Sequence, residues 1–273
     1  HADGSDEQPA VDVVYSLSAE ATSLEIKTIF ENVASKALTI PLEDDLRIDG
    51  RSEDVEKAPN ATERLFWAHD RFWGQAYGVF APDFMLQMNS DTRTSTLKFQ
   101  KPDGEVSVTL QPGEKYEFTR QIFPGQNLLD VKAIAERNTK MKLLPVKMIA
   151  SGANGQPLPS ALIEVYEGDE YRGSGKTDAD GRLESEIPAG RYIVKGIQWG
   201  QNLGDMPIEV KEDEGNRFEL KYQFRTGLVH GRITDGDAKP VPCKVEFISR
   251  GDAPPVNFGP DTAEFAVSNL VYA

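Results

Sequence analysis

The run VKMIA at residues 146–150 begins the stretch that decides the fold, and the stretch continues to FELKYQF at 218–224. Between them lie further short runs and turns: PLP at 157–159, ALIEVY at 161–166, TDADG at 177–181, LESEI at 183–187 and RYIVK at 191–195. In the last run, one face carries only apolar side chains: Phe218, Leu220, Tyr222 and Phe224. Alternation with a period of two between turns is typical of half-buried antiparallel strands. The stretch predicts a small antiparallel β-sandwich, and we expect an all-β chain of such sandwiches in tandem.

The order of motifs in this stretch is a second source of information. Strands alternate with Gly-x-Pro-x-Pro, Thr-Asp-x-Asp-Gly-Arg and Pro-x-Gly-x-Tyr, carried by Gly155, Pro157, Pro159, Thr177, Asp178, Asp180, Gly181, Arg182, Pro188, Gly190 and Tyr192. This order resembles the carboxypeptidase regulatory-like family, whose members are prealbumin-like (transthyretin-like), seven-stranded sandwiches related to the Cna-B modules of surface proteins. The resemblance implies a fold and an accessory role rather than a reaction, because a fold alone does not fix function.

The chain begins this unit a second time. VHGRIT at 229–234 predicts a strand, AKPVP at 238–242 matches GQPLP at 155–159, and KVEFI at 244–248 matches the next strand. The offset from Pro157 to Pro240 is 83 residues (240 − 157), which suggests modules in tandem. The later motifs do not recur before Ala273. We therefore expect that the natural protein continues past Ala273, or that this segment docks on its neighbour.

The sequence before residue 140 predicts another antiparallel sandwich. Alternating runs lie at 11–17, 24–30, 38–42, 97–99, 106–110 and 116–122, and the charged segment 47–60 is expected to be a loop. At 128–135, Leu128, Val131 and Ala135 fit one side of a short helix, although Val131 and Ala133 also fit a strand. The expected organisation has four segments: a flexible N-terminus at 1–10, a sandwich with an aromatic-rich segment at 11–139, the regulatory-like sandwich at 140–225, and an incomplete second module at 226–273.

The aromatic-rich segment is LFWAHDRFWGQAYGVF at 65–80. One interpretation is a pair of core strands, in which the aromatic side chains supply buried area and Asp70 and Arg71 satisfy each other. The other is a platform on which a sugar ring stacks, with polar side chains beside it. The candidate ligand-binding residues are Trp67, Asp70, Arg71, Trp73, Gln75 and Tyr77. If either face meets solvent, we expect the more polar one, with Trp67, His69, Arg71 and Trp73, continued by Gln75 and Tyr77.

Patterns for catalysis or metal binding are weak in this sequence. Asp178-x-Asp180-Gly181 resembles the start of a calcium loop, but the later acidic ligands do not follow, and the run is ordinary turn chemistry. The three histidines, His1, His69 and His230, lie far apart in different segments. Cys243, the one cysteine, can form no internal disulfide and is expected to be a small buried side chain. We therefore expect no catalytic residue, no metal ion and no cofactor.

Charge and composition narrow the partners and the compartment. The chain has 30 basic and 44 acidic residues, for a net charge of −14. This argues against nucleic acid or an anionic membrane as the main partner, because both attract cationic surfaces. No apolar run approaches the ~20 residues of a transmembrane helix, so membrane insertion is not expected. The acidic charge, the single cysteine and the β modules together favour a secreted or periplasmic bacterial protein.

These observations favour a non-catalytic accessory or binding region of a larger extracytoplasmic protein, with carbohydrate as the candidate ligand. The aromatic run RFWGQAYG at 71–78, followed by regulatory-like repeats, is similar to the N-terminal regions of CehA/McbA-type metallohydrolases. In that family a metal-binding hydrolase domain follows, so the resemblance implies that the neighbouring domains of a longer chain are partners. The alternative is a structural or adhesive cell-surface protein made of sandwich repeats.

Overall fold

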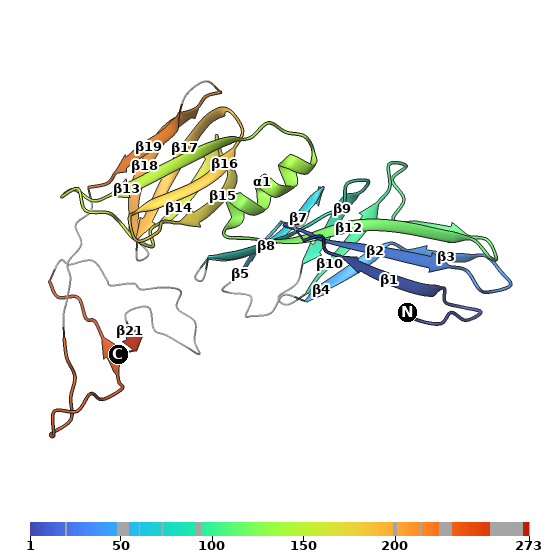
Figure 1. Ribbon diagram of the computed structural model, residues 1–273, viewed down its shortest axis with the longest axis horizontal. Coiled ribbons are helices and arrows are strands. Elements are labelled where there is room, and N and C mark those ends of the chain that lie inside the picture. The colour runs from blue at the N-terminus through green and yellow to red at the C-terminus, as the bar shows by residue number, and fades with distance from the viewer. Residues whose placement is uncertain are drawn as a thin grey trace. The chain divides into compact units, whose positions relative to one another are not determined.

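A computed structural model describes residues 1–19, 21–47, 55–59, 61–71, 74–90, 94–198, 201–212, 215–223, 231–251 and 270–272. The described residues form many short strands and one helix (Figure 1). The chain divides into unit 1, His1–Met141, and unit 2, Lys142–Ala273. The prediction of an all-β chain is confirmed, and the division lies two residues from the expected boundary after Thr139.

Unit 1 contains a large antiparallel sheet with the order β1-β2-β12-β8-β7-β5. Its strands are β1 (Ala10–Ser16), β2 (Leu24–Glu31), β12 (Lys115–Gly125), β8 (Gln75–Phe80), β7 (Leu65–Asp70) and β5 (Val55–Lys57). Strand β5 corrects the expectation of a loop throughout 47–60, because Val55–Lys57 pairs with β7. Because the segment is highly charged, it shows no alternation from which this three-residue edge strand could be predicted.

The smaller sheets of unit 1 complete its core. One has the order β4-β10-β9-β6 and the other pairs β11 with β3; the strands are β3 (Leu38–Pro41), β4 (Glu43–Arg47), β6 (Thr62–Glu63), β9 (Met85–Ser90), β10 (Thr94–Gln100) and β11 (Ser107–Leu110). Phe118 of β12 packs against Phe30, Phe84 and Phe99, with ring centroids 5.1–6.0 Å apart. Since Phe99 belongs to β10, this aromatic cluster joins two sheets into one core.

Helix α1 (Leu128–Asn138) packs against β7, β8 and β12. The Asn127 side chain accepts a hydrogen bond from the Asp130 backbone N–H at 3.0 Å, which caps the first turn. Gly78 of β8 permits the close approach, because a Cβ there would lie 2.8 Å from side-chain atoms of Phe123 and Val131. The helical alternative for this segment is confirmed.

Besides a short two-stranded sheet near its end, the described residues of unit 2 form two sheets, with the orders β16-β13-β19 and β15-β14-β17-β18. The strands are β13 (Leu144–Ser151), β14 (Leu162–Glu167), β15 (Glu170–Lys176), β16 (Arg182–Ile187), β17 (Gly190–Gln198), β18 (Gln201–Val210) and β19 (Asn216–Lys221). Seven strands are the number that the resemblance implies. The expectation of purely antiparallel pairing is wrong for one pair, since β19 runs parallel to β13.

The core of unit 2 lies between its two sheets. Leu220 and Tyr222 are buried, as predicted, and Phe218 is half-buried; Phe224 lies outside the described residues. Gly196 of β17 faces Tyr222 so closely that a Cβ there would lie 2.5 Å from the phenol ring. The contact explains why β17 carries a glycine in the middle of its run.

The expected repeat is visible as a repeated turn. The bridge between Ser151 and Pro157 recurs 83 residues later between Thr234 and Pro240. Three backbone hydrogen bonds recur at the same offset: Gly152–Gln156, Gly155–Gly152 and Leu158–Ala150 in the first copy, and Asp235–Lys239, Ala238–Asp235 and Val241–Ile233 in the second. Gly155 and its counterpart Ala238 both have positive φ, 75° and 61°. The local sequence therefore folds alike in both copies.

The remaining described part of unit 2 is short. Strand β20 (Lys244–Glu246) pairs with β21 (Leu270–Tyr272). Most of VHGRIT, expected as a strand, either lies outside the described residues or is not in a strand. Cys243 is half-buried rather than buried. Among the described residues, no helix has the length and apolar character needed to span a membrane.

Candidate binding surfaces

The aromatic-rich segment forms the hairpin of β7 and β8 in unit 1. Asp70 lies opposite Gln75, and Ala68 lies opposite Tyr77. Directly opposite residues of an antiparallel pair share a face. Gln75 and Tyr77 therefore lie on the face of Ala68 and Asp70, and the expectation that they continue the face of Trp67 is wrong. Trp73 and its neighbour at 72 lie outside the described residues.

The more polar face of this hairpin is covered rather than exposed. Trp67 is 8% exposed and His69 is 1% exposed. Trp67 lies opposite Gly78, on the face against which α1 packs, and the Lys132 ammonium lies 5.9 Å from the centroid of the Trp67 ring. Trp67 and His69 therefore do not meet solvent, and the condition attached to the platform interpretation is not fulfilled for these two residues. Their burial favours the core interpretation of the segment.

A polar group joins the edge strand β5 to this hairpin. Arg71 donates a hydrogen bond from Nη1 to Glu56 Oε1 at 2.8 Å. His69 Nδ1 lies 3.8 Å from Glu56 Oε2, which is too long for a hydrogen bond. Burial acts to raise the pKa of Glu56, but the neighbouring His69 and Arg71 outweigh it, so the pKa is lowered. The group stabilises the ionised carboxylate and so ties β5 to β7.

Glu56 and His69 of this polar group are incompletely hydrogen-bonded among the described residues. Both ring nitrogens of His69 and Glu56 Oε2 are buried without a hydrogen-bond partner in the part of the chain that the structure describes. Within the same residues, no three His, Cys, Asp or Glu side chains are placed to hold a metal ion. The sequence analysis missed Glu56, because it lies in a charged stretch with little alternation. Asp70, on the other face of β7, was a candidate, and it is half-buried.

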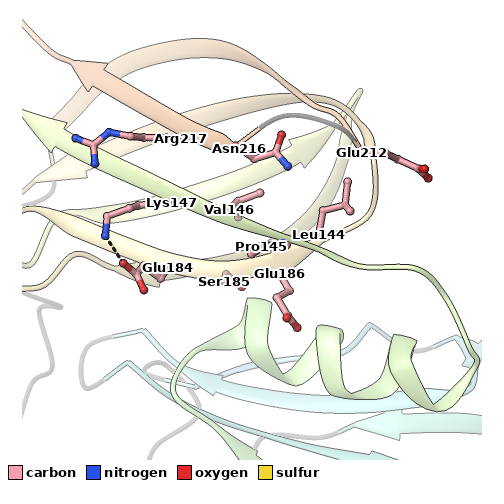
Figure 2. A pocket seen from close by; sticks show the side chains of 11 residues that line it. Leu144, Pro145, Val146, Lys147, Glu184, Ser185, Glu186, Glu212, Asn216 and Arg217 are labelled. Atoms are coloured by element: carbon pink, nitrogen blue, oxygen red, sulfur yellow. Dashed lines mark hydrogen bonds and ion pairs between the residues drawn. The ribbon is translucent and has the colours of Figure 1, made fainter.

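The outer face of the three-stranded sheet of unit 2 is charged. Lys147 lies opposite both Glu184 and Arg217, which makes a cross-strand row that we call the charged row. Figure 2 shows Lys147 paired with Glu184, whereas Glu186 and Glu212 point away from this pair. A cavity of about 660 Å³ opens here, with all of these residues in its lining.

The charges around this cavity are largely paired already. Arg217 forms an ion pair with Glu219 at 2.8 Å, and Glu212 forms one with Lys142 at 2.6 Å. These side chains are also well solvated, with between 46% and 65% of each exposed. A ligand would have to displace water from paired charges, which is costly. The cavity is therefore a poor candidate site.

The outer face of the four-stranded sheet of unit 2 is different. Tyr166 lies opposite Tyr171 and Ile193, and Ile193 lies opposite Pro207. We call this line of four apolar side chains, which crosses all four strands, the aromatic row. The rings of Tyr166 and Tyr171 have centroids 5.4 Å apart at an interplanar angle of 48°.

A second line of side chains lies beside the aromatic row. Glu164 lies opposite Ser174 and Lys195, and Lys195 lies opposite Asp205. We call this line the polar row. It places two carboxylates, one ammonium and one hydroxyl on the same side of the sheet, where Ser174 and Glu164 are themselves buried. The face therefore combines apolar rings with hydrogen-bonding groups.

Contacts between the two rows hold the tyrosine rings in place. The Tyr166 hydroxyl donates to the Glu164 carboxylate at 2.9 Å, and Tyr171 bonds to Ser174 at 2.7 Å. The Lys195 ammonium lies 4.3 Å from the centroid of the Tyr166 ring, within the range of a cation–π interaction. Glu164 is only 7% exposed. Both rings are thus fixed before any ligand arrives.

The sequence carries an indication of this surface at two outward positions of adjacent strands. In ALIEVY, the core-facing residues are Ala161, Ile163 and Val165, all fully buried. Tyr166 therefore occupies an outward position, where alternation predicts a polar residue. Ile193 likewise occupies an outward position in RYIVK, opposite Tyr166. Apolar residues at outward positions of two adjacent strands were the available indication.

Comparisons with known proteins find only weak structural similarity and no match in sequence. No protein-family model matches the chain, and no curated protein matches it. A TPR-domain containing protein from Parabacteroides distasonis is 13% identical, with a TM-score of 0.33 over 46% of this chain and 32% of that chain. A polysaccharide lyase is 11% identical, with a TM-score of 0.36 over 75% of this chain and 34% of that one.

A third solved structure is GH36 alpha-galactosidase AgaA from Geobacillus stearothermophilus, 13% identical with a TM-score of 0.31. The alignment covers 53% of this chain and 27% of that chain. The chain thus spans about a third or less of the length of each of these three structures. Likenesses this weak carry no argument about function, which has to be made from the surfaces described above.

Proposed function

We propose that this chain is a non-catalytic accessory region of a larger extracytoplasmic protein, and that it binds carbohydrate on the outer face of β15-β14-β17-β18. The aromatic row carries the proposal. The C–H faces of a sugar ring pack on aromatic rings, while its hydroxyls hydrogen-bond to polar groups at the side. Tyr166 and Tyr171 supply the rings, and Glu164 and Lys195 supply the polar groups.

The position of the aromatic row supports a binding role. Outer faces of sandwich sheets are usually polar, because only the inner faces pack into the core. The buried side chains on the inner face, such as Val165 and Val194, already supply the core of unit 2. In addition, fixed rings lose little conformational entropy when a ligand binds. The cost of keeping this apolar row outside the core is offset if it contacts a ligand.

The larger context is part of the same proposal. The seven strands of β13–β19 and the repeated turn support membership of the carboxypeptidase regulatory-like family. The neighbouring domains of a CehA/McbA-type metallohydrolase would then supply the chemistry, and this chain would hold the substrate or the cell surface. The acidic net charge and the low cysteine content support a secreted or periplasmic site of action.

A glycan array followed by isothermal titration calorimetry tests the proposal. We expect the purified chain to bind at least one glycan, and the variants Tyr166→Ala and Tyr171→Ala to bind it roughly ten-fold more weakly or not at all. The matched control is Tyr15→Ala, which removes an exposed tyrosine from β1 of unit 1 and should bind normally. Absence of binding by the parent chain to every glycan would refute the proposal.

A second candidate is a structural or adhesive surface protein made of sandwich repeats. The specific observation in its favour is the turn of Ser151–Pro157, which recurs 83 residues later. Sequencing the gene downstream of the codon for Ala273 separates the two candidates. A histidine-rich metal motif there favours the hydrolase, whereas further sandwich modules or a wall anchor favour adhesion.

A further inference from the structure

We infer that the free edge of β1 in unit 1 pairs with β1 of a second copy of this chain, and that the two copies form a symmetric dimer. The two strands run antiparallel, and Tyr15 of each copy lies opposite Tyr15 of the other. This inference concerns unit 1, so it goes beyond the glycan binding proposed for unit 2 and does not depend on it.

Strand β1 lies at one end of the large sheet of unit 1 (Figure 1). Its second half carries apolar side chains that are between 37% and 67% exposed: Val13, Val14, Tyr15 and, directly after the strand, Leu17. Asp12 is the one charged residue of β1, whereas β4, β15, β16 and β18, which also end sheets, each carry at least two. Charged side chains on an edge strand hinder the addition of another strand. The second half of β1 lacks this protection.

Two of the exposed side chains belong to the core side of the sheet. Val13 and Tyr15 lie opposite Thr28 and Ile26 of β2. Thr28 in turn lies opposite Phe118 of β12, which is buried in the core of unit 1. The apolar side of the sheet therefore continues onto its exposed edge, and a second β1 extends it across the symmetry axis.

The backbone of this edge already accepts one antiparallel segment. Ala2 and Val11 exchange two hydrogen bonds, Ala2 N–H to Val11 O at 2.8 Å and Val11 N–H to Ala2 O at 3.0 Å. Alternate residues of a strand direct their backbone groups toward the same edge, so Val13 and Tyr15 direct theirs as Val11 does. Among the described residues, no strand or bridge pairs with that edge at Val13 or Tyr15. Their N–H and C=O groups are therefore available to a partner strand.

The N-terminal residues determine where a partner strand can begin. Because Ala2 lies opposite Val11 in an antiparallel arrangement, His1 lies opposite Asp12, and His1 Nδ1 is 2.6 Å from Asp12 Oδ1. The edge is thus occupied as far as Asp12, and the free part runs from Val13 to Leu17 with Tyr15 at its centre. A twofold axis at Tyr15 lets two copies of this segment pair over its full length.

The free segment is complementary to itself in this register. On the core side, Tyr15 meets Tyr15 of the second copy, and Val13 meets Leu17. On the opposite side, Val14 meets Ser16. Like charges opposite each other destabilise a strand pair, whereas aromatic and β-branched pairs stabilise it. Since the segment from Val13 to Leu17 holds no charged residue, a second copy suits this edge as its occupant.

The expected dimer is weak. One five-residue strand on another makes a contact below the size of a standard protein interface. Each copy also has a net charge of −14, so the two copies repel each other at low ionic strength. Because salt screens this repulsion, the dimer should become stronger as the NaCl concentration rises.

Sedimentation equilibrium of the full chain from ~5 µM to ~500 µM tests the inference. We expect a monomer–dimer equilibrium that shifts toward the dimer as salt is added. Tyr15→Lys places two ammonium groups opposite each other at the axis and should weaken the dimer at least ~ten-fold. Tyr15→Phe keeps the ring and should dimerise like the parent chain.

The matched control is Met141→Lys, which introduces the same charge at another exposed apolar position of unit 1. It should leave the dimer unchanged, so that an effect of Tyr15→Lys cannot come from the change in net charge. Melting curves of each variant check that unit 1 is folded.

Disulfide cross-linking in a Cys243→Ser background tests the register. Residues directly opposite each other in a hydrogen-bonded pair have Cα atoms about 5.5 Å apart, which a disulfide can bridge. Tyr15→Cys should therefore give a covalent dimer under mild oxidation. Val14→Cys should cross-link at least ~ten-fold more slowly, because the two copies of residue 14 are diagonal neighbours about 7–8 Å apart.

Three outcomes would overturn the inference. The first is a parent chain that stays monomeric over the whole concentration range, including one that instead binds an extended peptide on β1. The second is a dimer that survives unchanged in folded Tyr15→Lys, which would move the contact to another surface. The third is faster cross-linking through Val14→Cys than through Tyr15→Cys, which would exclude an axis at Tyr15.

Discussion

The two outer faces of unit 2 cover one core but have opposite characters. On β16-β13-β19, the charged row consists of Glu184, Lys147 and Arg217 in that order. On β15-β14-β17-β18, the corresponding line is the aromatic row with Tyr166 at its centre. The cavity of about 660 Å³ lies on the charged face. The choice of the proposed binding face therefore rests on chemistry rather than on cavity volume, because desolvating apolar rings costs less free energy than desolvating paired charges.

The largest expected effect comes from emptying the core that both faces share. Leu220 of β19 is 1% exposed, and Leu220→Ala should lower the free energy of unfolding of unit 2 by ~2–5 kcal/mol, through lost burial and a cavity. Chemical denaturation measures this. Glu219→Ala, on the outward side of the same strand, should change stability by less than ~0.5 kcal/mol. Equal effects of the two changes would contradict the assignment of faces.

A second core change acts beneath the aromatic face. Gly196→Ala places a Cβ 2.5 Å from the Tyr222 ring, and the buried ring has little room to move. The expected loss of stability is ~1–3 kcal/mol, as for other overpacked sites. Glycan affinity should fall with it, because β17 carries Ile193 and Lys195.

Gly215→Ala is the matched control, since a Cβ there meets no atom within 4 Å. Gly215 lies beside the charged face. This variant should melt like the parent, and a destabilised Gly215→Ala with a normal Gly196→Ala would reverse the comparison.

The pH dependence of unit 2 gives a smaller effect. Burial, with a contribution from Asp205, raises the pKa of Tyr222 well above its ordinary value. A raised folded-state pKa means that the stability from this group is complete below the unfolded pKa of about 10 and is lost as the pH rises above it. Denaturation curves from pH 8 to 11 should therefore show an alkaline decline that is reduced in Tyr222→Phe.

The phenylalanine variant has a second expected property. The Tyr222 hydroxyl is buried without a hydrogen-bond partner in the described residues. Its removal at pH 7 should leave the stability unchanged or raise it by up to about 1 kcal/mol. Parallel pH curves for the parent and Tyr222→Phe would show that Tyr222 does not cause the decline.

The smallest effect is expected on the charged face itself. Lys147→Ala removes an ion pair in which Glu184 is 66% exposed, and exposed pairs contribute ~0–1 kcal/mol. We expect a loss in this range at low salt that shrinks at 1 M NaCl, with glycan affinity unchanged. A loss of glycan binding in this variant would move the site to the charged face.

Much of the fold was predictable because it depends on neighbours in sequence. The turns at Gly155 and Gly181 were read from local turn chemistry, and the repeated turn at Thr234–Pro240 followed from the same pattern. The burial of Leu220 and Tyr222 was predicted from the period-two alternation of their strand. Strand β5 was not predicted, because its three residues, one apolar and two charged, are too few to show an alternation of apolar and polar side chains.

Contacts between distant residues were not predictable in this way. Arg120 and Asp44 form a partly buried bidentate ion pair, with Nε–Oδ2 at 2.6 Å and Nη2–Oδ1 at 2.9 Å, although they are 76 residues apart. The parallel pairing of β19 with β13 is a second case. The burial of Trp67 is a third case, since α1 covers a face whose own sequence looks polar.

For the proposed binding surface, the sequence by itself determined which side chains each strand presents outward, because the alternation of a strand is a local property. Only the tertiary structure decided which of these side chains form a row, because register between strands depends on the whole sheet. Tyr171 and Pro207 lie 36 residues apart (207 − 171) and reach the same row through β14 and β17. A surface that crosses several strands cannot be recognised in the linear sequence, because its residues lie far apart along the chain.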